Sequence, residues 1–297
     1  MKVRFLPFLM LPILGMAQAN SNGEVPLGGN TSSERQTLEI KRNASFNLEE
    51  IKVRWKKVAL ENCQGAPCVV IPPAPSFTCG TSTISDKDNN VYNTVLIGTQ
   101  CWTKQNLKVS KYNDGTAIPL DNSGNSMGTS WPTWAFLTTG SYVIYANESS
   151  SLTNGNASNY GYLYNWYAAN DSRKLCPVGW HVPTDTEWTN LIQYIDPASS
   201  AVSNGSSFNA AKKLHANSPL WTPFNYGTDD YGFSALPGGT TGTGTFEKVN
   251  TQAFFWSDTE YDINFAWYRG MDAPSFIVYR EKTYRKQMGA SVRCLKD

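Results

Sequence analysis

Apolar residues recur at helical spacing most clearly between residues 184 and 195. The apolar positions there are i, i+3, i+4 and i+7, which lie along one face of a helix: Trp188, Leu191, Ile192 and Ile195. Thr184 precedes this run and Glu187 follows three residues later, which is the spacing of a capping box. The pattern predicts an amphipathic helix over 184–195, and a weaker pattern predicts a second helix over 207–216.

Shorter apolar runs predict strands on both sides of these helices. Residues 91–97 and 101–109 form two strand-like runs that residues 98–100 join. From Tyr231 onward, short apolar runs alternate with glycine-rich turns, which is typical of antiparallel strands. Residues 121–159 are rich in Ser, Asn, Gly and Thr and predict long surface loops. The sequence therefore predicts an α+β fold with short antiparallel strands, two helices and long loops.

The first 19 residues have the three parts of a secretory signal peptide. Lys2 and Arg4 make the start positive, residues 5–16 are apolar, and residues 17–19 form a small-x-small cleavage site. The apolar stretch is too short to cross a bilayer comfortably, and no later segment approaches 18 apolar residues. We therefore expect an exported chain, extracellular, at the cell surface or periplasmic, without a transmembrane segment after the leader is removed.

Residues 20–75 predict a flexible N-terminal segment that precedes the main domain. Its first part is polar, and residues 47–60 then carry apolar side chains at helical spacing. Residues 51–56 also alternate as a strand would, so a strand is the alternative to a helix over 47–60. The proline-rich stretch at 71–75 predicts a stiff linker. We therefore place one domain over 76–297.

Composition narrows the class of protein. The chain has 25 basic and 24 acidic residues, a formal net charge of +1. This balance argues against a nucleic-acid partner, because phosphate contacts need clustered Lys and Arg. Charged residues make up 16% and aromatic residues 13% of the chain, which argues against disorder over most of its length.

Six cysteines are spread along the chain: Cys63, Cys68, Cys79, Cys101, Cys176 and Cys294. An even number of cysteines in an exported chain favours disulfides, although six thiols leave many pairings open. Zinc is the alternative ligand. No two cysteines have CxxC spacing, and His181 and His215 do not flank a cysteine pair at zinc-finger spacing, so disulfides are favoured.

Six motifs occur in order along the chain: VYNTVLIGTQCWTKQNLKVSKYNDGTAIP, YGYLYNWYAA, LCPVGWHVPTDTEW, GFSALPGG, FFWSDTEYD and GASVRCLKD. Together they resemble the Fibrobacter succinogenes major paralogous domain, which is found in exported proteins of Bacteroidetes and Fibrobacteres. The resemblance covers roughly residues 77–297. It implies a C-type-lectin-like fold related to the formylglycine-generating enzymes, and no agreed biochemical activity. Within such a fold we expect four tryptophans in the core: Trp180, Trp188, Trp256 and Trp267.

The resemblance also implies where a ligand would bind. Variable proteins of diversity-generating retroelements have a similar Trp-rich start and GxSVRC-like end, and they display changeable side chains on the closing region of this fold. The corresponding interval lies between Ser257 and Lys286 and supplies these candidates: Tyr261, Asp262, Asn264, Tyr268, Arg269, Asp272, Arg280 and Arg285. This mixture suits adaptable recognition. An ordinary polar face on edge strands is the alternative.

Three disulfides follow from the order of the cysteines and the implied fold. Cys63–Cys68 would close a tight turn, and Cys79–Cys101 would join the ends of a hairpin-like segment. Cys176–Cys294 would tie the segment before the main helix to the last strand, as a long-range clasp in this kind of fold. The paired Cα atoms should then lie roughly 4.4 to 6.8 Å apart.

No cofactor is expected, although calcium is an alternative at one turn. Asp86, Asp88 and Asn90 lie at alternate positions as in an EF-hand loop, but the glycine and the bidentate glutamate of that loop are missing. An Asp- and Asn-rich turn is the favoured interpretation, and Asp229-Asp230 is an equally weak second signal.

Catalytic motifs are also missing from the sequence. His181 lies in an apolar run, where a structural, hydrogen-bonded histidine is favoured over a catalytic base, and no GxSxG elbow accompanies it. We therefore expect a non-catalytic binding module that recognises a glycan or a protein at the bacterial cell surface. A structural or matrix-associated envelope protein is the alternative.

Overall fold

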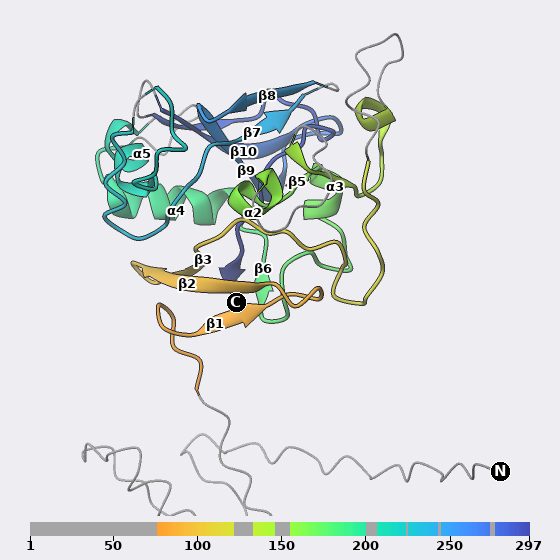
Figure 1. Ribbon diagram of the computed structural model, residues 1–297, viewed down its shortest axis with the longest axis horizontal. Coiled ribbons are helices and arrows are strands. Elements are labelled where there is room, and N and C mark those ends of the chain that lie inside the picture. The colour runs from red at the N-terminus through yellow and green to blue at the C-terminus, as the bar shows by residue number, and fades with distance from the viewer. Residues whose placement is uncertain are drawn as a thin grey trace, which may run out of the picture. The chain divides into compact units, whose positions relative to one another are not determined.

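The computed structural model describes residues 76–121, 133–145, 155–199, 207–223, 225–242, 245–273 and 277–297. These residues form a mixed α+β structure with two five-stranded sheets, one two-stranded sheet and short helices (Figure 1). The expected leader, the helix over 47–60, the linker at 71–75 and the Cys63–Cys68 pair lie outside the described residues.

The first sheet contains the start and the end of the domain. Its strand order is β1 (Thr83–Ser85), β2 (Val91–Ile97), β3 (Gln100–Thr103), β12 (Leu295–Lys296) and β6 (Trp180–His181), and all its pairs are antiparallel. The predicted hairpin is confirmed, but its second strand ends at Thr103 rather than at Val109. Beyond that point Leu107 donates its N–H to the carbonyl of Val292, so the chain leaves β2 to follow the C-terminal segment.

The second sheet is built from the strands that lie between residues 238 and 281. Its strand order is β11 (Val278–Glu281), β10 (Ala266–Asp272), β9 (Gln252–Glu260), β7 (Gly238–Thr241) and β8 (Phe246–Val249). The predicted antiparallel pairing is confirmed for three of its four contacts, whereas β7 and β9 are parallel at Gly239 and Ala253. Two further strands, β4 (Tyr142–Val143) and β5 (Leu163–Tyr164), form the small sheet.

The main helix forms where the sequence predicts it. Helix α4 spans Asp185–Ile195, and both bonds of the Thr184–Glu187 capping box are present. Helix α5 spans Phe208–Leu214, with the Ser207 side chain as its N-cap. The expected count of two helices is too low, because α2 (Asn156–Tyr160), α3 (Trp166–Ala169) and a 3₁₀ turn at Thr133–Phe136 also form. These are too short to show helical periodicity in the sequence.

Helix α4 packs between the two large sheets. Figure 1 shows α4 with β7 to β10 on one side and β1 to β3 on the other. Trp188 of α4 contacts Trp102 of β3 at 4.7 Å and Phe255 of β9 at 5.5 Å between ring centroids, and all three side chains are buried. Within the described ranges, no helix has the length and apolar character needed to cross a membrane.

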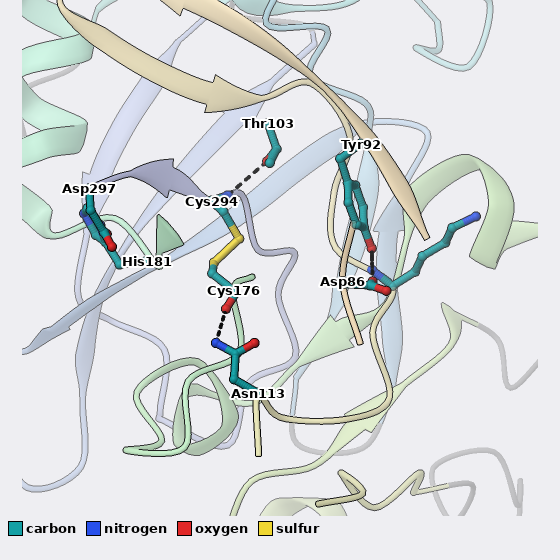
Figure 2. Close-up of a disulfide and its surroundings, with 9 residues drawn as sticks. Asp86, Tyr92, Thr103, Asn113, Cys176, His181, Cys294 and Asp297 are labelled. Atoms are coloured by element: carbon teal, nitrogen blue, oxygen red, sulfur yellow. Dashed lines mark hydrogen bonds and ion pairs between the residues drawn. A yellow bond between two sulfur atoms is a disulfide. The ribbon is translucent and has the colours of Figure 1, made fainter. Parts of the chain in front are cut away.

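Two of the predicted disulfides are present. The Cα atoms of Cys79 and Cys101 lie 5.9 Å apart, and those of Cys176 and Cys294 lie 5.8 Å apart. Figure 2 shows the second bridge, where Cys294 donates its N–H to the Thr103 hydroxyl and the Asn113 amide donates to the Cys176 carbonyl. Both pairings are confirmed.

A buried arginine links the last strand region to residues 103–106 and 233–234 at the centre of the domain. Arg293 is 1% exposed, and its guanidinium donates to Asn106 Oδ1 at 2.6 Å. It also donates to the carbonyls of Thr103, Phe233 and Ser234 at 2.7 to 3.0 Å. Burial lowers the pKa of this guanidinium. Carbonyl and amide oxygens bind the guanidinium directly, and the charge of Asp229 opposes the effect of burial.

Two details of the closing region differ from the prediction. The last strand was expected to include Cys294 but is only Leu295–Lys296, because Ala290 bridges to Tyr164 and Ser291 to Phe255 as the chain passes between sheets. Trp180, Trp188 and Trp256 are buried as predicted, whereas Trp267 is only partly buried. The Trp267 ring instead packs against the Arg280 guanidinium and the edge of Tyr261.

Candidate ligand-binding face

Four side chains form an aromatic–cationic cluster at the surface of the second sheet: Tyr261, Trp267, Arg280 and Lys282. The Arg280 Cζ lies 3.5 Å from the centroid of the Trp267 ring, and the Lys282 Nζ lies 3.8 Å from that of Tyr261. The two rings meet edge to face at 5.4 Å. Tyr261 is 45% exposed and follows the end of β9, so solvent reaches the cluster from the loop side.

A carboxylate at the start of α4 fixes the arginine of this cluster. Arg280 donates to both oxygens of Asp185 through Nε and Nη2, at 2.7 to 3.0 Å. Arg269, which is 2% exposed, donates to the same carboxylate at 2.7 Å. Burial opposes the charge of Asp185, but the bonds and charges of the two arginines lower its pKa below the usual value. The ionised carboxylate thus holds both guanidinium groups in fixed positions.

The buried Lys286 side chain anchors the loop between β9 and β10. The Lys286 ammonium is 4% exposed and donates to Glu260 Oε1 at 2.6 Å and to the Ile263 carbonyl at 3.1 Å. At the tip, Asp262 Oδ1 accepts the N–H groups of Asn264 and Phe265. The loop therefore presents Tyr261 and the 81% exposed Ile263 on an ordered backbone.

The candidate residues from the sequence divide into three groups in the structure. Four are exposed: Tyr261, Asp262, Asn264 and Arg285. Asp272 and Arg280 are half-buried. Tyr268 and Arg269 are buried, so neither side chain is accessible at the surface in this structure. Arg269 points toward α4, and Tyr268 packs on the opposite side of the sheet against Trp256 and Tyr284.

Two members of the aromatic–cationic cluster are missing from that set of candidates, Trp267 and Lys282. Trp267 was expected in the core, and Lys282 carries no motif of its own. The available signal was the alternation along the strands, because residues two apart lie on the same face. Arg280 and Lys282 have this spacing, as do Trp267 and Arg269. Only the position of α4 shows which of these side chains it covers.

The turn considered for calcium uses its oxygens internally. Asp86 accepts the N–H groups of Asp88 and Asn90 through Oδ1, and its Oδ2 accepts the Tyr92 hydroxyl at 2.6 Å. Asp88 accepts from Ser110 and pairs with Lys111 at 3.1 Å. At the second signal, Asp229 accepts the backbone N–H and the hydroxyl of Ser234. Both sites have the hydrogen bonding of Asp-rich turns.

His181 has two carboxylate partners, one of which is the last residue of the chain. His181 Nδ1 is 2.6 Å from Asp297 Oδ1, and its Nε2 is 3.0 Å from Glu187 Oε1 (Figure 2 shows His181 beside Asp297). Burial alone would lower the pKa of His181, but the hydrogen bonds and charges of Asp297 and Glu187 raise it above 6.5. His181 thus links β6 to Glu187 of α4 and to Asp297, and both carboxylates favour its protonated form.

The model of one protein family matches most of this domain. The Fibrobacter succinogenes major domain matches residues 95–296. The chain belongs to this family. No curated protein and no solved structure is significantly similar to it. The matched region of this Fibrobacter succinogenes major domain begins after β1 and Cys79. It includes Arg293 with its partners and the aromatic–cationic cluster.

The two histidines of the domain predict opposite effects of pH on its stability. The raised pKa of His181 means that its stabilising contribution is complete below pH 6.5 and is lost as pH rises through the folded value. Burial lowers the pKa of His215 to about 3, so stability is lost as pH falls below 6.5 and the unfolded chain binds a proton. We would measure the free energy of unfolding in urea between pH 5 and 8.5. It should fall less toward high pH in His181→Gln than in the wild type, and less toward low pH in His215→Gln. Unchanged slopes in both variants would contradict these assignments.

Replacement of Lys286 tests the anchoring of the β9–β10 loop. Lys286→Met removes the donor to Glu260 and to the Ile263 carbonyl, and we expect a local loss of about 1 to 2 kcal/mol. Amide hydrogen exchange at Asn264 and Phe265 should become about tenfold faster. Lys87→Met, in the exposed β1–β2 turn, should leave this exchange unchanged. Equal exchange in all three proteins would show that Lys286 does not order the loop.

Proposed function

We propose that this domain is an exported, non-catalytic binding module of the bacterial cell surface, and that the aromatic–cationic cluster contacts its glycan or protein ligand. The observation that carries the proposal is the exposed Tyr261 ring beside Trp267, with two cations held over these rings. Tyr, Trp and Arg are the side chains that contribute most at binding sites, especially where they are held in place before binding.

A C-type-lectin-like topology is part of the same proposal. It is supported by the Cys176–Cys294 bridge, which ties the segment before α4 to the segment before β12. It is also supported by the pairing of β12 with β3 and β6, since this brings the end of the domain back to the sheet that contains its first strands. An experimental structure with a different strand order would contradict it.

Export and the lack of catalysis rest on separate observations. Two disulfides in the described residues fit an oxidising compartment. Cys176 is bonded to Cys294, and both ring nitrogens of His181, the residue considered as a base, face carboxylates. These residues are therefore engaged in holding the fold, which supports binding as the activity.

Saturation binding of the labelled full chain to envelope particles tests this function. The particles would come from the bacterium that produces the protein. We expect saturable binding that unlabelled chain displaces, and a large loss of it in Trp267→Ala. Phe136→Ala is the matched control, because Phe136 is 68% exposed in a different part of the domain. Association that never saturates, or that is equal in the two variants, would contradict the proposal and favour a structural envelope role.

A further inference from the structure

In the aromatic–cationic cluster and the adjacent Arg269, cationic side chains outnumber the carboxylates that lie close to them. Asp185 compensates both Arg269 and Arg280, so one carboxylate serves two guanidinium groups. Lys282 adds a third cation and pairs with no carboxylate among the described residues. The Asp262 carboxylate follows Tyr261 and is hydrogen-bonded to two N–H groups of its own loop, so three cations still face two carboxylates. An anionic ligand is therefore the charge-complementary one.

The unused donors of these cations are arranged around aromatic rings. Arg280 binds Asp185 through Nε and Nη2, and in the described part of the chain its Nη1 has no hydrogen-bond partner. The Arg280 Cζ and the Lys282 Nζ lie 3.5 and 5.3 Å from the same Trp267 centroid. Both cations therefore lie beside one ring, where the carboxylate of a ligand would meet charge-assisted donors, and Tyr261 offers a partly exposed ring next to them.

The size of the apolar surface separates two classes of ligand. A stable protein interface buries about 800 Å² on each partner around an apolar centre. On this face, only Tyr261 and Ile263 are large apolar side chains that are exposed in the described residues. A sugar needs less, because an aromatic ring and a few well-placed polar groups suffice. The face is thus better matched to a saccharide than to an acidic protein.

We infer that the aromatic–cationic cluster binds an anionic polysaccharide whose sugar rings carry carboxylates. Lys282 Nζ and Arg280 Nη1 bind the carboxylate, and the Tyr261 ring packs against the C–H groups of the sugar. This inference rests on the proposed function and names the class of ligand for the same site.

Affinity electrophoresis of the full chain tests the inference with four probes of known composition. Polygalacturonate is the acidic saccharide, galactan and dextran are neutral saccharides, and polyglutamate is the acidic polypeptide. We expect polygalacturonate alone to retard the protein, with weaker retardation at higher salt. Lys282→Gln should weaken this binding about tenfold, since a hydrogen bond between charged groups is lost. Lys87→Gln makes the same charge change in the exposed β1–β2 turn and should bind like the wild type.

Each other outcome overturns the inference in a distinct way. Equal retardation by galactan or dextran would show a saccharide site that does not select for charge. Retardation by polyglutamate to the same extent would identify an acidic polypeptide as the ligand class. A lack of retardation by all four probes, or equal binding in Lys282→Gln and the wild type, would remove the site assignment. If the envelope particles still bind the chain saturably, the proposed function stands although this inference fails.

Discussion

Replacement of Arg293 by methionine should destabilise the domain more than any other single substitution considered for it. Methionine fills part of the same volume but leaves Asn106 Oδ1 and three backbone carbonyls without a donor. Each buried acceptor left unpaired costs about 1 to 3 kcal/mol. Removal of a buried charge returns part of this cost. We expect a net loss on the order of 4 kcal/mol in urea unfolding of the full chain.

Two further variants separate the roles of charge and hydrogen bonding at this centre. Arg293→Lys keeps the charge, but one ammonium has only three donors at one point and cannot reach four acceptors. It should therefore also destabilise, though less than methionine. Arg285→Met removes an exposed arginine and should change the free energy of unfolding by less than about 0.5 kcal/mol. A loss below about 1 kcal/mol in Arg293→Met would show that the stability of the domain does not depend on the four hydrogen bonds of this side chain.

Removal of the Cys176–Cys294 bridge should have the second large effect. These residues are 118 positions apart, so the bridge closes a long loop in the unfolded chain. The chain-entropy model gives about 4 to 5 kcal/mol for such a loop. We therefore expect Cys176→Ser with Cys294→Ser to lower the midpoint of urea unfolding strongly, under conditions that keep the other bridge oxidised.

The shorter bridge provides the comparison. Cys79 and Cys101 are 22 positions apart, for which the same model gives about 3 kcal/mol. Their double serine variant should lose less stability than the Cys176 and Cys294 variant. Loop length and the burial of Cys176 and Cys294 both predict this order, so the reverse order would contradict the loop-entropy account of the two bridges.

Local sequence signals predicted the parts of the fold that depend on neighbouring residues. The Thr184–Glu187 capping box fixed the start of α4, since both of its bonds form within one turn. The 91–97 run predicted β2, because a short apolar run that ends at a glycine turn is typical of a strand, and Tyr92, Thr94 and Ile97 are buried in it. The cysteine order predicted two pairings, since the implied fold brought the last segment back to the residues before α4.

The contacts that define the centre and the candidate site could not be predicted in this way. Arg293 and Asn106 are 187 positions apart, and nothing in either local sequence points to the other. Trp267 and Arg269 follow the same alternation on β10, yet Arg269 is buried against α4 and Trp267 is not. The difference depends on where α4 begins, which is a tertiary property.

The stabilising centre and the proposed binding face use different side chains. Arg293 joins the β3 end, the Asn106 segment and the segment at 233–234, whereas Arg280 and Lys282 lie on or just after the edge strand β11. Asp185 of α4 is the link that positions Arg280 on that edge. Changes to the cluster should therefore alter binding with smaller effects on folding than changes to Arg293.

Oxidative footprinting of the envelope-bound full chain tests the central claim most directly. Hydroxyl radicals would label the free chain and the particle-bound chain, and mass spectrometry would compare the oxidation of individual side chains. The account predicts protection of Tyr261 and Trp267 on binding, with no change at the exposed Phe136. Equal oxidation of Tyr261 and Trp267 in both states, or protection confined to Phe136, would contradict the assignment of the aromatic–cationic cluster as the ligand-binding face.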